Sequence, residues 1–74
     1  MIAGILREAS LALEAAGSPT SRLDAEVLLG YCLKVDRLYL YTHPEQVLHS
    51  EAVEDYAKKI DRRKQGEPIA YIIG

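Results

Sequence analysis

The fold of this chain is decided by residues 21–33, which read SRLDAEVLLGYCL. Apolar residues recur there at three- and four-residue steps, and this spacing predicts a helix over residues 22–33. The predicted apolar stripe contains Leu23, Val27, Leu28, Tyr31 and Cys32, widened by Leu29 and Leu33. Because this segment is more apolar than the one before it, we expect it at the centre of the molecule.

The start of this helix carries a capping-box pattern. The Ser21 hydroxyl can accept a hydrogen bond from the free amide three residues on, and Asp24 stands where Glu or Gln is usual. The Asp24 carboxylate also complements the positive end of the helix dipole. Gly30 costs about 1 kcal/mol relative to alanine inside a helix, so we expect a close helix crossing there.

Outward from this segment, four further helices are predicted. Their expected ranges are 3–16, 37–42, 51–65 and 69–73. Asp36 and Ser50 stand as N-caps of the second and third of these, and Pro68 fits the first position of the last. The sequence therefore predicts one all-α domain over residues 1–74, a small bundle of about five helices with short connectors.

Composition excludes several classes of protein. The 74 residues hold 9 Lys and Arg against 11 Asp and Glu, a net charge of −2, which argues against a domain that mainly holds nucleic acid. Cys32 is the single cysteine and cannot form an internal disulfide; with His43 and His49 it gives too few ligands for a metal site. No apolar run reaches the length of about 18 residues that a membrane-spanning helix needs. Charged residues interrupt the first segment, which argues against a secretory signal peptide. We therefore expect a cytoplasmic protein with no membrane partner.

The sequence offers no catalytic equipment. Its five glycines are dispersed and form no phosphate-binding loop, and no nucleophile-elbow motif occurs. Asp24 and Glu26 stand two apart on a helix and diverge, which disfavours a paired acid and base. We therefore predict no catalytic, cofactor-binding or metal-binding residue in this chain.

Charge is separated along the second half of the chain. Residues 31–57 sum to −3, whereas residues 58–74 sum to +3. Either the basic end complements the helix dipole and is solvated, or it forms a docking patch for an acidic partner or for RNA. No aromatic residue is interleaved among residues 58–64 for base stacking, which counts against RNA.

Two stretches carry more specific information. The first is residues 21–29, SRLDAEVLL, followed by Val35-Asp36-Arg37 and Leu38-Tyr39; the second is residues 62–74, RRKQGEPIAYIIG. Together they resemble the N-terminal domain of the HemK/PrmC family. Members of that family are S-adenosylmethionine-dependent methyltransferases that modify the glutamine nitrogen N5 in the Gly-Gly-Gln motif of class I peptide-chain release factors. The resemblance covers nearly the whole chain, and the second stretch is the more specific.

The resemblance implies a two-part enzyme in which a small helical domain precedes a catalytic domain. S-adenosylmethionine and an Asn-Pro-Pro-Tyr motif would belong to that catalytic domain, which is expected to follow beyond Gly74. The helical domain alone would not be an enzyme; it would help to grip the release factor and would contact its own catalytic domain. Candidate contact residues are Arg22, Arg37, Lys58, Lys59, Arg62 and Lys64, whereas Asp24, Arg63, Glu67 and Pro68 are expected to fix helix ends and an interhelical corner.

Two other functions stay open from the residues. One is a free-standing helical protein–protein interaction module. The other is nucleic-acid binding through the basic face of residues 58–64, which the net charge disfavours. A stop codon after Gly74 would favour the free-standing module, and a glycine-rich strand-turn-helix further on would favour the enzyme.

Overall fold

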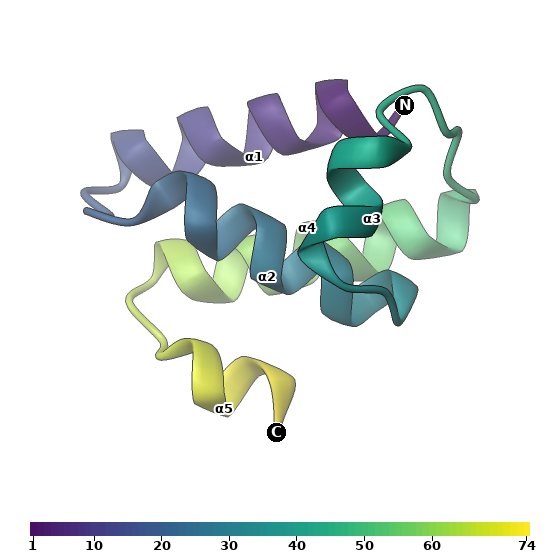
Figure 1. Ribbon diagram of the computed structural model, residues 1–74. Coiled ribbons are helices and arrows are strands. Elements are labelled where there is room, and N and C mark those ends of the chain that lie inside the picture. Colours follow the sequence, from purple (N-terminus) through teal and green to yellow (C-terminus); the bar gives the residue numbers. More distant parts are fainter.

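The computed structural model describes all of residues 1–74 and is built of helices alone. Its helices are α1 (Ile2–Ala15), α2 (Ser21–Leu33), α3 (Arg37–Thr42), α4 (Ser50–Lys64) and α5 (Ile69–Ile73). Figure 1 shows α1 above α2, α5 at the bottom of the view, and the short α3 standing across one end. The predicted all-α bundle is confirmed, and each predicted helix agrees with an observed one to within one residue at either end.

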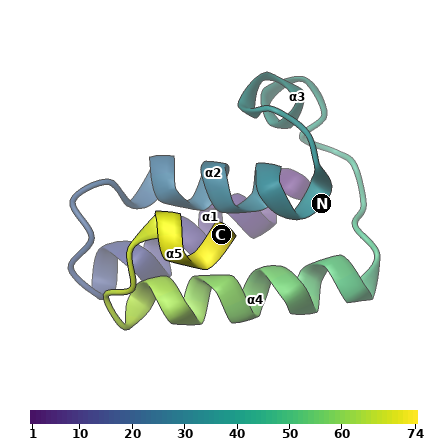
Figure 2. The ribbon, with the colours of Figure 1, turned by 90° about the horizontal axis from the view of Figure 1, so that it is seen from below.

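Helix α2 lies at the centre of the bundle, as its apolar sequence predicts. It packs against each of the other four helices, and Figure 2 shows it between α3 and the α4–α5 pair. Its residues Ala25, Leu28 and Leu29 are fully buried. The rest of the core comes from Ile2, Leu6, Ala9 and Leu13 of α1, Leu40 of α3, Tyr56 and Ile60 of α4, and Ile72 of α5. The bundle therefore has one continuous core with α2 as its axis.

The predicted apolar stripe of α2 is wrong at two positions. Leu23 and Tyr31 are 43% and 51% exposed, whereas Asp24 and Glu26 are buried. The buried face of α2 centres on Ala25, Leu28 and Leu29, so it is rotated away from the predicted stripe. Both carboxylates are tolerated inside because hydrogen-bond donors from other elements reach them.

The capping box predicted at the start of α2 is also wrong. The N-cap is Thr20, one residue earlier, and no side chain caps the helix. Ser21 already lies in the first turn, so its hydroxyl is not in the cap position. Asp24 instead accepts hydrogen bonds from Ser18 Oγ at 2.9 Å and Thr20 Oγ1 at 3.0 Å. Its carboxylate therefore secures the loop before α2 rather than the helix amides.

Of the other residues predicted at helix starts, Asp36 has its predicted role, whereas Ser50 and Pro68 each stand one position from theirs. Asp36 caps α3, because its Oδ1 accepts from the Tyr39 amide at 2.9 Å. Helix α4 begins at Ser50 itself, after an N-cap at His49 that gives no side-chain bond. Pro68 is the N-cap of α5 rather than its first residue.

Gly30 does not mark a helix crossing, contrary to the prediction. A Cβ at this position would lie 2.8 Å from the carbonyl oxygen of Val35, in the turn that follows α2. Lys34 ends the helix in the left-handed conformation, with φ 58°, and the Val35 amide returns to the Gly30 carbonyl at 2.9 Å. Gly30 therefore makes room for the turn that directs the chain into α3.

The first turn of α1 is capped by the connector between α3 and α4. The amides of Ile2 and Ala3 donate to the carbonyls of Gln46 and Pro44 at 2.9 and 3.0 Å. No side chain caps α1, so these carbonyls satisfy donors that a helix start otherwise leaves open. The Gln46 side chain accepts in turn from the Tyr39 hydroxyl of α3 at 2.5 Å, which fixes the connector.

Candidate functional site

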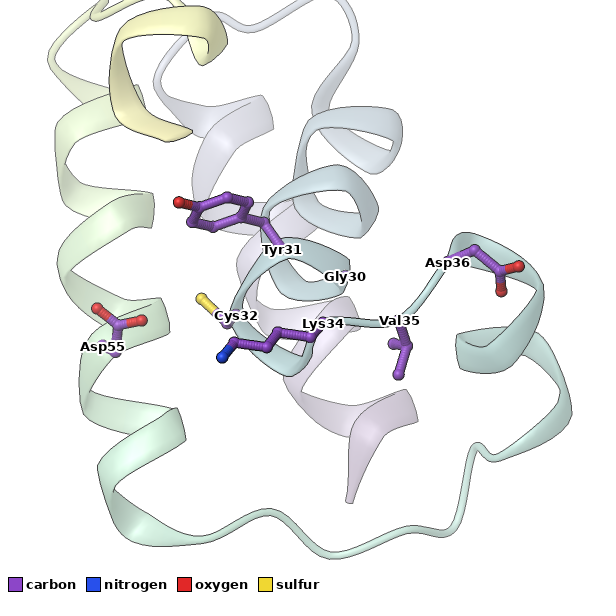
Figure 3. A pocket seen from close by; sticks show the side chains of 7 residues that line it. All are labelled: Gly30, Tyr31, Cys32, Lys34, Val35, Asp36 and Asp55. Carbon is purple, nitrogen blue, oxygen red and sulfur yellow. The ribbon is translucent and has the colours of Figure 1, made fainter. Parts of the chain in front are cut away.

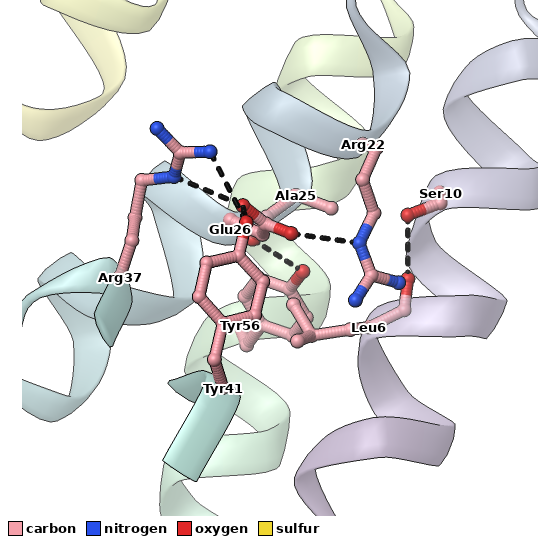
Figure 4. A network of polar contacts seen from close by, with 8 residues as sticks. All are labelled: Leu6, Ser10, Arg22, Ala25, Glu26, Arg37, Tyr41 and Tyr56. Atoms are coloured by element: carbon pink, nitrogen blue, oxygen red, sulfur yellow. Dashed lines mark hydrogen bonds and ion pairs between the residues drawn. The ribbon is translucent and has the colours of Figure 1, made fainter. Parts of the chain in front are cut away.

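A buried carboxylate, Glu26, organises the polar surface between α2 and α3. It accepts hydrogen bonds from Arg22 Nε at 2.8 Å, from Arg37 Nε at 2.9 Å and from the Tyr41 hydroxyl at 2.5 Å. Figure 4 shows the two guanidinium groups on opposite sides of this carboxylate, with the Tyr41 ring beside it. We call Arg22, Glu26, Arg37 and Tyr41 the arginine clasp.

Local helix geometry explains why these four side chains meet. Arg22 and Glu26 are four residues apart on α2, and Arg37 and Tyr41 are four apart on α3, so each pair lies on one helix face. The turn at Lys34 then brings α3 back against α2. The clasp therefore joins two helices through side chains from both.

The clasp separates a hidden negative charge from two accessible positive charges. The Glu26 side chain is 1% exposed, whereas those of Arg22 and Arg37 are 52% and 49% exposed. Each arginine uses its Nε on Glu26, and Arg37 also donates from Nη2 to the Tyr41 hydroxyl at 3.2 Å. The remaining guanidinium donors are free to meet a partner from solvent.

The electrostatics keep Glu26 ionised. Burial works to raise the pKa of this carboxyl, but hydrogen bonds from Tyr41, Arg22 and Arg37 together lower the pKa below its ordinary value. The bonds to Glu26 and Tyr41 raise the pKa of the Arg37 guanidinium in return. The clasp is therefore charged on both sides at neutral pH.

A second polar cluster ties α4 to the loop before α2. Arg63 Nε donates to Asp24 Oδ2 at 3.0 Å, and Arg63 Nη1 donates to the carbonyl of Glu67 at 3.1 Å. Thus Asp24, Arg63 and Glu67, three of the four residues predicted to fix helix ends, are brought together, and Pro68 follows directly as the N-cap of α5. This corner lies directly before α5.

The remaining predicted contact residues lie along α4, away from the clasp. Lys59 pairs with Asp55 at 2.8 Å and lies 5.7 Å from the centre of the Tyr31 ring. Arg62 pairs with Glu67, and Lys64 lies 4.0 Å from Asp61. Lys58 is exposed and forms no ion pair. The six candidate cations therefore divide into one pair on α2 and α3 and four on α4.

A shallow depression lies where α2 ends opposite the start of α4, and it contains the single thiol. Figure 3 shows Cys32 facing Asp55 across this depression, with Tyr31 and Lys34 at its edges. Burial, with a hydrogen bond and the charge of Asp55, raises the pKa of the Cys32 thiol to about 11. The thiol is therefore protonated at neutral pH and is a poor nucleophile. No group of three or more His, Cys, Asp or Glu side chains is placed to hold a metal ion.

Sequence reasoning missed Glu26, which it treated only as one of two diverging carboxylates. Part of the signal was present, because Arg22 and Glu26 have the four-residue spacing of a helical ion pair. The contact with Arg37 was not visible, since it joins residues eleven apart across a turn.

The fold and these contacts define a small all-helical domain whose accessible arginines are anchored by a buried carboxylate. The sequence profile of the PrmC N-terminal domain matches residues 4–74, and the chain belongs to that family. This confirms the resemblance found in the two sequence stretches. None of the five helices is long and apolar enough to cross a bilayer.

Several curated relatives are named release factor glutamine methyltransferase. The protein of Shewanella oneidensis is 50% identical over 60 residues, which are 81% of this chain and 21% of the relative. That of Koribacter versatilis is 48% identical over 62 residues, 84% of this chain and 22% of the relative. That of Aliivibrio fischeri is 38% identical over 73 residues, 99% of this chain and 26% of the relative. The chain therefore spans between 21% and 26% of the length of these relatives. No solved structure matches the chain.

Proposed function

We propose that this chain is the substrate-docking domain of a protein-(glutamine-N5) methyltransferase that acts on class I peptide-chain release factors. The observation that carries the proposal is the family match over residues 4–74, together with relatives that are named for this activity. Residues 1–74 act as one helical domain, and the parent protein works in the cytoplasm.

The physical argument for docking starts from the size of the target group. One glutamine side chain offers little surface, so discrimination among proteins must come from contacts elsewhere on the substrate. A rigid helical bundle with anchored, accessible cations suits that task. The candidate contacts are the arginine clasp and the cations of α4.

The chemistry of methyl transfer belongs to another part of the parent protein. S-adenosylmethionine would be held by a catalytic domain that follows this one, and the docking domain would also contact that domain. No catalytic role is assigned to residues 1–74, and the one thiol is a poor nucleophile because burial and Asp55 hold it protonated.

Calorimetric titration of the 74-residue chain tests this division of labour. The chain should bind a class I release factor weakly, because the avidity given by a second domain is missing, and should give no heat with S-adenosylmethionine. Saturable binding of S-adenosylmethionine to this chain would contradict the proposal. Failure to bind the release factor at any accessible concentration would favour an unrelated interaction module.

A further inference from the structure

We propose that Arg22, Arg37 and Tyr41 are the contact surface of this domain and that they take a carboxylate-bearing segment of a protein partner. The identity of that partner, a class I release factor, rests on the proposed function. The physical basis is the buried Glu26 carboxylate, which holds two half-exposed guanidinium groups in fixed positions (Figure 4).

The hydrogen-bonding capacity of the arginines is only partly used inside the protein. A guanidinium group has five N–H donors in a planar fork that matches a carboxylate. Glu26 takes only the Nε donor of each arginine, and one Nη of Arg37 reaches Tyr41. Because Glu26 already orders both side chains, less conformational entropy is lost when a partner binds.

The clasp differs from the other candidate contact cations, those of α4, in where its counter-charge lies. On α4 the partner carboxylates of Lys59 and Lys64 are themselves at the surface, with Asp55 52% and Asp61 69% exposed. Those pairs present both signs to an approaching protein. Glu26 is 1% exposed, so a partner meets the two guanidinium groups and not the carboxylate.

The surroundings of the clasp favour a protein segment over nucleic acid. Leu38 and Tyr41, on the same short helix as Arg37, are 66% and 52% exposed. Arginine and tyrosine, with tryptophan, are the residues most enriched among those that dominate protein interfaces. The exposed leucine adds apolar surface that a protein partner can bury. The chain as a whole carries −2, so the long phosphate backbone of a nucleic acid would be repelled beyond this patch.

A charge-neutral double variant tests the surface. Glu26→Gln with Arg37→Gln removes the Arg37 guanidinium group together with its buried counter-charge. The double variant therefore leaves no unpaired buried charge and keeps the net charge at −2. We expect it to weaken binding of the release factor by about tenfold. Its matched control, Arg7→Gln with Glu8→Gln, removes one exposed charge of each sign on α1 at the same net charge and should change the affinity by less than about twofold.

Nuclear magnetic resonance on the wild-type chain separates this inference from the proposed function. The Nε–Hε signals of Arg22 and Arg37 should shift on addition of a glutamate-rich peptide and stay in place with a lysine-rich one. If the release factor does not bind but these signals shift, the proposed function fails and the surface stands. If the release factor binds both double variants and the wild type equally, the surface is wrong and the proposed function stands.

Two further results are decisive. Signals that shift with an RNA oligonucleotide and not with the glutamate-rich peptide would overturn the assignment to a protein segment. If circular dichroism shows the double variant unfolded, Arg37→Lys replaces it, because lysine keeps the charge beside Glu26 but lacks the fork. That variant should weaken release-factor binding by about threefold, and an unchanged affinity would overturn the inference.

Discussion

Arg63 Nε lies 3.0 Å from Asp24 Oδ2, and this ion pair joins residues 39 positions apart in the chain. The Asp24 side chain is 8% exposed and that of Arg63 is 21% exposed, so solvent screens the pair only in part. Ser18 and Thr20 donate to the same carboxylate. One side chain therefore connects the α1–α2 loop to the end of α4.

Asp24→Ala should lower the free energy of unfolding by about 2–3 kcal/mol, because it leaves a partly buried guanidinium and two hydroxyls without their acceptor. Urea denaturation followed by circular dichroism measures this. Asp61→Ala is the control, since its ion pair with Lys64 is long and exposed, and it should cost less than about 0.5 kcal/mol. Equal losses in the two variants would show that the corner contributes no more than a surface pair.

Leu28→Ala tests the central position of α2. Leu28 is fully buried, so the substitution should cost about 2–5 kcal/mol, comparable to the whole stability of a domain this small. The far-ultraviolet signal and thermal melt should therefore be largely lost. Leu38→Ala, at a leucine that is 66% exposed, should melt close to the parent. A parent-like melt for Leu28→Ala would contradict the described core.

Two glycine-to-alanine changes should act in opposite directions. At Gly30 the added methyl group would lie 2.8 Å from a backbone carbonyl oxygen, so Gly30→Ala should destabilise the protein although alanine favours helices. At Gly4 the methyl group meets nothing within 4 Å, and Gly4→Ala should stabilise by about 0.5–1 kcal/mol. The urea concentration at the unfolding midpoint of each variant measures these effects. A higher midpoint than the parent's for both variants would rule out the close turn after α2.

Glu26 should make stability depend on pH in the acid range. Its carboxyl titrates near about 4.3 in the unfolded chain, whereas in the folded protein its pKa is lowered. The stability it contributes is present above the unfolded pKa and is lost as the pH falls through the folded pKa. Tm measured from neutral pH into acid should therefore fall less steeply for Glu26→Gln than for the parent. The exposed control Glu45→Gln should follow the parent, and coincidence of all three curves would contradict the clasp.

Cys32 should react slowly while the protein is folded. Burial and Asp55 raise the pKa of its thiol to about 11, so at about pH 8 the reaction with iodoacetamide should be at least about tenfold slower than in denaturant. Mass spectrometry over time gives both rates. Asp55→Asn should speed the folded reaction by removing the charge that opposes the thiolate. A folded rate equal to the denatured rate would show that the thiol is freely accessible.

The helices were predictable because their signals are local. Asp36 caps α3 through its own side chain, and Gly17 and Gly66 take the positive φ that ends the preceding helices. The sequence also placed α2 at the centre. These features depend on residues within one or two turns of each other, where spacing and residue type suffice.

The burial of charge was not predictable in this way. Asp24 and Glu26 read as surface carboxylates, because hydropathy assigns charged side chains to solvent. The buried Glu26 has Arg37 among its partners, which returns from the next helix, and the buried Asp24 has Arg63, which arrives from α4. The residue pattern of one helix does not show which side chains of another helix contact it. The arginine clasp could therefore be recognised only in the structure.

The carbonyls of Pro44 and Gln46 receive the Ala3 and Ile2 amides, so the start of α1 is tied to a connector more than forty residues further along the chain. Loosening of that connector would therefore be felt at the opposite end of the sequence. These two amides would lose their protein acceptors and exchange their hydrogens with water.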